Sequence, residues 1–183
     1  MDTSTNGEIC IFTGMTERQR LLLKDCWQDH IGLAPQLVDA AQEQFGVQFM
    51  FWLLETIPNA KKRFTKFDGT LPQEQLLANK EFRNHCRIVA KWFDSMIRLL
   101  DTPVELEMET HHLAITHLFF TPKIGSEYFD VFQAKFPQFM ASQIKRALVD
   151  DEVKAWGMLA NLISSKVKKS EGMIASQQCC CVL

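Results

Sequence analysis

Residues 57–67 read IPNAKKRFTKF, and the fold prediction depends on what lies at fixed distances from this stretch. Its proline follows a strongly apolar run and either ends that helix or begins a short turn, because proline cannot continue a helix. Phe64 and Phe67 stand three residues apart. His85 comes twenty-one residues after Phe64, and His117 comes thirty-two residues after His85. The stretch therefore lies between a buried helix and two segments that each carry a histidine.

The hydrophobic pattern on both sides of this stretch is helical. Apolar residues recur three or four positions apart, which is the spacing of one helix face. No segment alternates as a strand would, so we expect an all-α chain of six or more helices. The expected helices begin at Thr16, cover about 37–57, run from residue 73 or 79 to 100, begin again at Pro103, and cover 126–148 and 151–169.

Two helix starts carry explicit capping signals. Thr16 and Gln19 have the spacing of a capping box, in which each side chain bonds the other's backbone N–H. Thr102 precedes Pro103 and Glu105, a combination typical of an N-cap followed by the first helical turn. We expect a flexible N-terminal tail over 1–15, one domain over 16–169 and a C-terminal tail over 170–183.

Composition excludes several classes of function. The 183 residues carry a net charge of −2, so no basic surface for nucleic acid is expected. No apolar run approaches the length of a membrane span or a signal peptide, so we expect an intracellular protein. Three of the six cysteines crowd the C-terminus and the others are scattered, which does not resemble a disulfide framework.

The stretch HHLAITH, residues 111–117, contains three of the five histidines. A helix turns by about 100° per residue, so His111 and His112 point away from His117 and cannot easily close on one ion with it. His117 shares its face with apolar Leu113, and His85 shares its own with Val89. Each alone could be a hydrogen-bonded core histidine, but two neutral imidazoles on apolar faces suit an iron held in a flat, apolar cofactor.

These segments together resemble the globin family, and among its members the intracellular invertebrate globins, nematode ones especially. Pro58, Phe64 and Phe67 match the globin pattern of a proline that opens a short helix and two phenylalanines beside the haem. Gly46 lies where globins need a small residue for two helices to cross closely. The similarity covers about 16–169 and implies a globin fold of six to eight helices around a neuroglobin-like haem pocket.

The resemblance implies haem b (iron protoporphyrin IX) as cofactor. His117 would be the proximal iron ligand, and His85 the distal residue, either donating to a bound gas or acting as a sixth ligand. The other residues that the resemblance places at the cofactor are Phe64, Val89, Leu113, Ile124, Phe129, Met50 and Lys66. The lysine would meet a haem propionate, as Lys123 could, although for each lysine taken singly a solvated surface residue is the simpler interpretation.

Two neighbours of the histidines have alternative roles. Thr116 or a backbone carbonyl one turn earlier could accept the second ring N–H of His117 and fix the tautomer that binds iron. Cys86, beside His85, is either a redox sensor or a small core residue.

The last four residues, Cys-Cys-Val-Leu, fit a prenylation motif. We expect a geranylgeranyl group on Cys180, because the terminal residue is leucine, and palmitate on Cys179. Lys166, Lys168 and Lys169 would support attachment to the inner, cytoplasmic face of a membrane. The alternative is a free, reactive tail without lipid.

We therefore expect a membrane-tethered globin that binds O₂ or another diatomic gas and acts in redox or gas-sensing signalling with an unknown electron-transfer partner. Simple O₂ storage is one alternative, and a haemless interaction module anchored to a membrane is another. We do not expect an enzyme, since no further acid–base group accompanies His85; weak peroxidase or nitrite reductase activity would be side chemistry.

Overall fold

The computed structural model describes residues 8–30, 38–144 and 146–180, and within these ranges it contains helices and no strand. The expected all-α architecture is confirmed. Seven α-helices and two short 3-10 helices follow one another in these described ranges. Their bounds are α1 Glu17–His30, α2 Val38–Thr56, η1 Pro58–Arg63, α3 Gln73–Ala78, α4 Lys80–Arg98, η2 Leu99–Asp101, α5 Pro103–Leu118, α6 Ser126–Gln143 and α7 Asp150–Cys180.

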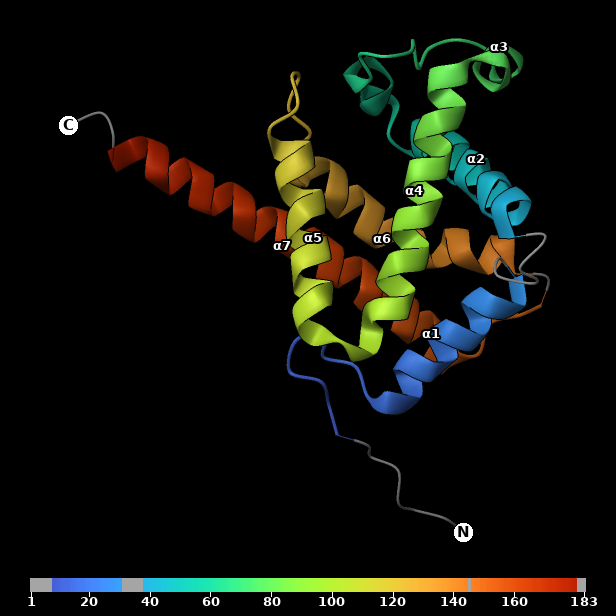
Figure 1. The fold of residues 1–183 in the computed structure, drawn as a ribbon, viewed down its shortest axis with the longest axis vertical. Coiled ribbons are helices and arrows are strands. Elements are labelled where there is room, and N and C mark those ends of the chain that lie inside the picture. The colour runs from blue at the N-terminus through green and yellow to red at the C-terminus, as the bar shows by residue number, and fades with distance from the viewer. Residues whose placement is uncertain (1–7, 31–37, 145, 181–183) are drawn as a thin grey trace.

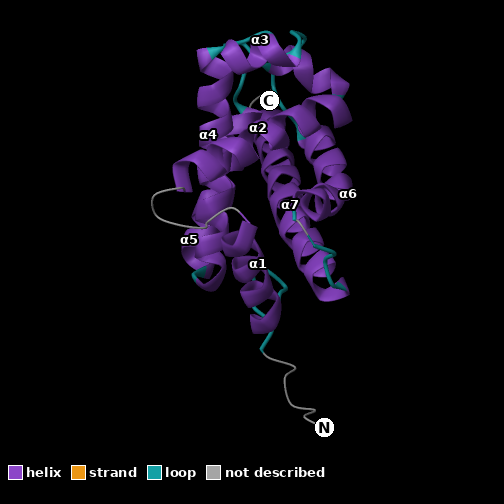
Figure 2. Cartoon of the chain, turned by 90° about the vertical axis from the view of Figure 1, so that its right-hand side faces the viewer, coloured by secondary structure: helices purple, strands orange, loops and turns teal. Residues whose placement is uncertain are grey.

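The helices pack as a layered bundle. In Figure 1, α7 crosses the middle of the molecule and its C-terminal end projects beyond the other helices. It packs along α6 and also against α5 and α1, while α2 packs across α4. The short helix α3 closes one end of the molecule, and α1 lies towards the opposite end (Figure 2).

The α2–α4 crossing depends on Gly46. A Cβ atom added at this position would lie 2.1 Å from the backbone oxygen of Cys86 on α4. That distance is far inside van der Waals contact, so no larger residue fits without separating the two helices. The expectation of a small residue at this crossing is confirmed, and the crossing fixes the part of α4 that carries His85.

Aromatic side chains fill the core between α2, α4, α6 and α7. Phe93 stacks on Phe136 with ring centroids 5.2 Å apart, and Phe136 meets the fully buried Trp156 edge to face. Removing each such side chain from water contributes on the order of 2–3 kcal/mol. This core packs α4 against α6; α4 carries His85, and α6 carries Phe129, which contacts His117.

Residues 8–15, which the sequence places in a tail, form an ordered turn on the body of the protein. Gly14 has a φ of 69°, a left-handed conformation that glycine adopts without strain, and its N–H donates to the Cys10 carbonyl. Met15 is fully buried in the main core. The segment has no helical periodicity, so its burial could not be read from pattern.

The last helix is also longer than expected. The predicted helix ends at Lys169, whereas α7 continues to Cys180. Ser170 is buried, and Ile174 packs against a small cluster that contains Ala114 and Leu118 of α5. The first turns beyond Lys169 are therefore packed against the helix that carries His117. The helix α6, by contrast, ends at Gln143, before the expected residue 148.

The two capping predictions have different outcomes. Thr16 and Gln19 form the expected reciprocal box, with N–H to oxygen distances of 3.0 and 3.3 Å. Thr102 and Pro103 do stand at the N-cap and at the first position of α5, as expected, but the Thr102 side chain makes no cap hydrogen bond. Its hydroxyl donates to the Leu99 carbonyl, because the short helix η2 ends immediately before it. Asn79 instead caps α4 and accepts hydrogen bonds from two backbone N–H groups.

Across the described ranges, no helix combines the length and the apolar character that spanning a membrane requires.

Candidate functional site

His117 lies in the last turn of α5, and its ring is held by a backbone hydrogen bond. Its Nδ1 lies 2.9 Å from the carbonyl oxygen of Leu113. A carbonyl can only accept, so Nδ1 carries the proton and the lone pair of Nε2 is left free. Of the two acceptors considered for this ring, the backbone carbonyl holds it, while Thr116 is exposed.

The surroundings of His117 come from the segment that follows it. The ring of Phe129 on α6 meets the imidazole edge to face, with centroids 5.3 Å apart and an interplanar angle of 89°. Phe120 lies 6.3 Å from the same ring. The Ile124 N–H donates to the His117 carbonyl at 3.1 Å, so the loop after α5 folds back onto the residue it follows.

The ring of His85, on α4, packs against two phenylalanines. Phe64 meets it edge to face at 5.3 Å, and Phe67 lies 6.2 Å away. The two phenylalanines stack on one another at 4.6 Å. No hydrogen-bond partner for the His85 ring is present in the described part of the chain, so its polar atoms are available to a ligand.

Both imidazoles are neutral near pH 7. Burial, with smaller contributions from His117 and Lys66, lowers the pKa of His85 to about 4. Burial also lowers the pKa of His117, against the opposing effect of its hydrogen bond to Leu113. The influence of His117 on His85 shows that the two rings lie within electrostatic reach of each other. A neutral imidazole is the form that binds a metal ion.

Apolar side chains around the two histidines are less covered than the core beside them. Each packs against a buried cluster yet stays partly exposed, whereas neighbours such as Cys86, Ala90 and Ala114 are fully buried. The partly exposed set is Phe64, Val89, Leu113, Ile124 and Phe129. Such incompletely covered apolar surface, together with two neutral imidazoles, fits a flat apolar group carrying a metal. Met50 differs, since it is enclosed in the main core.

The two candidate propionate partners have different surroundings. Lys66 is exposed, and none of the described residues pairs with its ammonium group. Lys123 forms an ion pair with Glu171 of α7 at 2.5 Å. Lys66 is therefore the freer of the two cations.

The remaining sequence candidates do not converge on a metal. His111 and His112 are exposed, and no group of three His, Cys, Asp or Glu residues suited to a metal ion occurs in the described ranges. Cys86 is fully buried, and burial raises the pKa of its thiol to about 12. A thiol so protected packs as a core residue, which favours that role of Cys86 over a redox sensor.

The globin family model matches residues 47–167 of this chain. The chain belongs to the globin family. The matched region contains α4 and α5 with both histidines, and the globin fold predicted from the sequence is confirmed. Members of this family bind haem, which agrees with the fit of the residues around His85 and His117.

Several known proteins are similar to this globin. A globin of Biomphalaria glabrata is 26% identical over 125 residues, which are 68% of this chain and 82% of that protein. Ferric Aplysia limacina myoglobin with azide superposes with a TM-score of 0.69 at 19% identity, covering 84% of this chain and 97% of that one. A hexacoordinated haem protein of an anhydrobiotic tardigrade gives a TM-score of 0.70 at 15% identity, covering 85% and 94%. At 19% and 15% sequence identity, the likeness to these two structures shows the fold alone.

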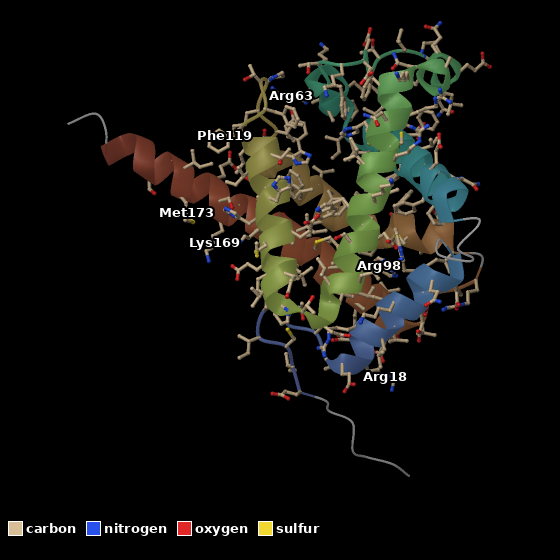
Figure 3. The ribbon with its side chains drawn as sticks, viewed as in Figure 1. Arg18, Arg63, Arg98, Phe119, Lys169 and Met173 are labelled. Atoms are coloured by element: carbon tan, nitrogen blue, oxygen red, sulfur yellow. The ribbon has the colours of Figure 1, made fainter. Side chains whose placement is uncertain are left out.

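Several residues that border this globin's site were not found from the sequence. Phe120 is one, because an exposed phenylalanine beyond a helix end carries no pattern. Arg63 donates to the Tyr128 hydroxyl at 2.7 Å and lies over its ring, joining η1 to α6. Figure 3 shows Arg63 at the same end of the molecule as Phe119. Glu171 was missed because it lies beyond the predicted end of α7.

The lipidation candidates cannot be placed in the same way. The side chains of Cys179 and Cys180, and the whole of residues 181–183, lie outside the described part of the structure.

Proposed function

We propose that this globin binds haem b between α4 and α5, with His117 as the proximal iron ligand. The observation that carries the proposal is the hydrogen bond from His117 Nδ1 to the Leu113 carbonyl, which leaves Nε2 free for a metal. A carbonyl that accepts the other ring N–H orients an imidazole ligand and raises its basicity. The partly exposed apolar residues Phe64, Val89 and Phe129 would exclude water from the two faces of the cofactor.

When bound, haem would supply an iron that takes O₂ or another diatomic gas and exchanges electrons. His85 would act on the opposite side from His117. Its neutral ring, without a partner in the described chain, can donate to a bound gas or occupy the sixth iron position. The tardigrade protein and a Drosophila haemoglobin of the same fold are described as hexacoordinate, which favours the second role. Lys66 would pair with a propionate.

The test is a visible absorption spectrum of the purified chain with haemin, first ferric and then reduced with dithionite. We expect stoichiometric uptake with a sharp Soret band that is lost in His117→Ala. The matched control is His112→Ala, which removes an exposed histidine from the same helix and should leave uptake unchanged. Equal uptake by His117→Ala and the unmodified chain would contradict the assignment, and no uptake by either would favour a haemless interaction module.

A variant on α4 decides between the two roles of His85. His85→Leu keeps the apolar surroundings and removes both ring nitrogens. If His85 is a sixth ligand, the split, intense bands of the reduced spectrum should collapse to one broad band while uptake is retained. If the unmodified chain already shows a single broad band, the sixth position is open and His85 serves as a hydrogen-bond donor.

We further propose that the protein works at the cytoplasmic face of a membrane in redox or gas-sensing signalling rather than in O₂ storage. The support is the Cys-Cys-Val-Leu motif, with prenylation at Cys180 and palmitoylation at Cys179. A tethered protein cannot diffuse with its cargo, which argues against bulk carriage. Mass spectrometry of the protein from eukaryotic cells should detect the lipid, and Cys180→Ser should move it from the membrane fraction to the soluble fraction.

A further inference from the structure

Glu171 of α7 joins three elements that surround His117. Its Oε2 accepts a hydrogen bond from the Ser126 N–H at 3.0 Å, at the first residue of α6. Its Oε1 lies 2.5 Å from the ammonium nitrogen of Lys123 in the α5–α6 loop, residues 119–125. One carboxylate thus satisfies an otherwise free N–H of a helix start and pairs with a cation of the loop before it.

The α5–α6 loop is in turn bonded to the histidine. Between Lys123 and Ser126 lies Ile124, whose N–H donates to the His117 carbonyl at 3.1 Å. Gly125 permits the close approach, since a Cβ atom there would lie 3.0 Å from Glu171 Oε1 and 2.4 Å from Glu127 Oε2. The two residues that Glu171 holds therefore lie on either side of the residue that contacts His117.

The helix that carries Glu171 is itself fixed against α5. Ser170 is buried, and Ile174, three residues after Glu171, packs on the cluster of Ala114, Leu118 and Val167. Leu113, the acceptor for His117 Nδ1, packs against the same cluster. The Glu171 carboxylate thus extends from a helix that is packed against α5, and its side chain is 24% exposed.

We propose that Glu171 is a positioning residue for His117, which acts by holding the α5–α6 loop in the conformation that bonds the His117 carbonyl. The role of Glu171 in orienting His117 as an iron ligand rests on the proposed haem-binding function. Glu171 does not touch the cofactor. It limits the movement of the last turn of α5, so the direction of the His117 ring depends on a residue of the extended part of α7.

The first arm of the test uses the full chain without haem. Amide hydrogen exchange at Ile124 and Ser126 is measured in the unmodified protein, in Glu171→Ala and in Glu171→Gln. Alanine removes both contacts and should accelerate exchange about fivefold, the effect of losing one hydrogen bond of ordinary strength. Glutamine keeps an acceptor for the Ser126 N–H and should restore most of the protection at Ser126.

The control is Glu107→Gln. Glu107 on α5 pairs with Lys166 on α7 at 3.0 Å, so this variant breaks another contact between the same helices without touching the loop. Exchange at Ile124 should be unchanged in it. Unchanged exchange in Glu171→Ala, or equal acceleration in Glu107→Gln, would overturn the proposal, because the carboxylate would then be dispensable or merely stabilising.

The second arm uses the haem-loaded chain and measures the iron–histidine stretching frequency of the reduced protein by resonance Raman spectroscopy. Glu171→Ala should shift and broaden this band, while Glu171→Gln and Glu107→Gln leave it near its original position. A band unmoved in Glu171→Ala would overturn the ligand-positioning role. If the unmodified chain takes up no haem, the haem-binding function and the ligand-positioning role both fail. If uptake is normal and the band does not move in Glu171→Ala, only the positioning role of Glu171 fails.

Discussion

The two histidines occupy similar apolar faces, yet the protein holds them by different means. His117 is fixed by a hydrogen bond to Leu113 and by a loop bonded to its own carbonyl. His85 is held by Phe64 and Phe67, with no polar partner for its ring in the described chain. A hydrogen bond fixes the direction in which a ring points, whereas packing against other rings mainly limits the space that the ring can occupy. The α5 side is therefore built for a fixed orientation, and the α4 side allows the ring to turn.

Gly46→Ala should have the largest effect on stability, and it should act on the packing of α4, which carries His85. The new methyl group would meet the Cys86 carbonyl at 2.1 Å, a backbone atom that cannot rotate away. Separating α2 from α4 should lower the free energy of unfolding by about 3 kcal/mol, at the upper end for overpacking. Urea unfolding followed by tryptophan fluorescence measures this loss.

The matched control for this substitution is Gly172→Ala. This glycine lies on α7, and a Cβ atom added there meets nothing within 4 Å. Alanine has the higher helix propensity, so the variant should gain about 0.5–1 kcal/mol. Equal losses in the two glycine variants would mean that α2 and α4 are not in tight contact at Gly46.

The starts of α4 and α5 offer a second comparison between the helix that carries His85 and the helix that carries His117. Asn79 accepts from the Glu81 and Phe82 N–H groups at 2.9 and 3.0 Å, so Asn79→Ala should cost about 1–2 kcal/mol. Thr102 makes no such cap, and Thr102→Ala should cost less than about 0.5 kcal/mol. Thermal unfolding of both variants tests this, and a reversed order would contradict the capping assignment.

Tyr128→Phe tests the contact that joins η1, just before Phe64, to α6, which carries Phe129. The hydroxyl accepts from Arg63 Nε at 2.7 Å, and the guanidinium lies 5.4 Å from the ring centre. Phenylalanine keeps the ring contact and loses the hydrogen bond, so the loss should be about 1 kcal/mol. In a double-mutant cycle with Arg63→Met, the double variant should lose less than the sum of the single variants. Strict additivity would show that the pair contributes nothing.

Much of this architecture follows from spacing along the chain. Gly46 lies at a helix crossing, as the residues that resemble the globin pattern around Pro58 imply, and the Cβ geometry agrees. Helix periodicity separated His117 from His111 and His112, and the latter two are exposed. These features depend on residue type at a fixed separation, which is the information that a sequence carries directly.

The features that spacing did not reveal depend on contacts between distant segments. Glu171 lies 45 residues from its partner Ser126, in a stretch whose polar composition reads as a tail. Met15 is buried although its segment has no periodicity, because the turn packs on a core formed by other helices. Thr102 has the sequence of a cap, yet the carbonyl of Leu99 competes for its hydroxyl. Tertiary neighbours decided each case.

The smallest expected effect concerns the pH dependence of the α5 side. Hydrogen bonds from Lys123 and Ser126 lower the pKa of Glu171 from its ordinary value of 4.5 to about 2. A carboxylate with a lowered pKa in the folded state contributes stability that is complete above pH 4.5 and lost as the pH falls towards 2. Because the pair is partly exposed, we expect less than about 1 kcal/mol.

Comparing the unmodified protein with Glu171→Gln separates the contribution of the Glu171 charge from that of the histidines. The lowered pKa values of His85 and His117 mean that unfolding takes up protons below pH 6.5, so stability falls there in both proteins and cancels in the difference. The neighbouring Glu127 is likewise common to both. The difference in unfolding free energy, from urea titrations between pH 3 and 7, should be constant above pH 5 and shrink below 4.5. A difference unchanged down to pH 3 would mean that the Glu171 charge does not stabilise the α5–α6 loop, and that the hydrogen bond to Ser126 alone holds it.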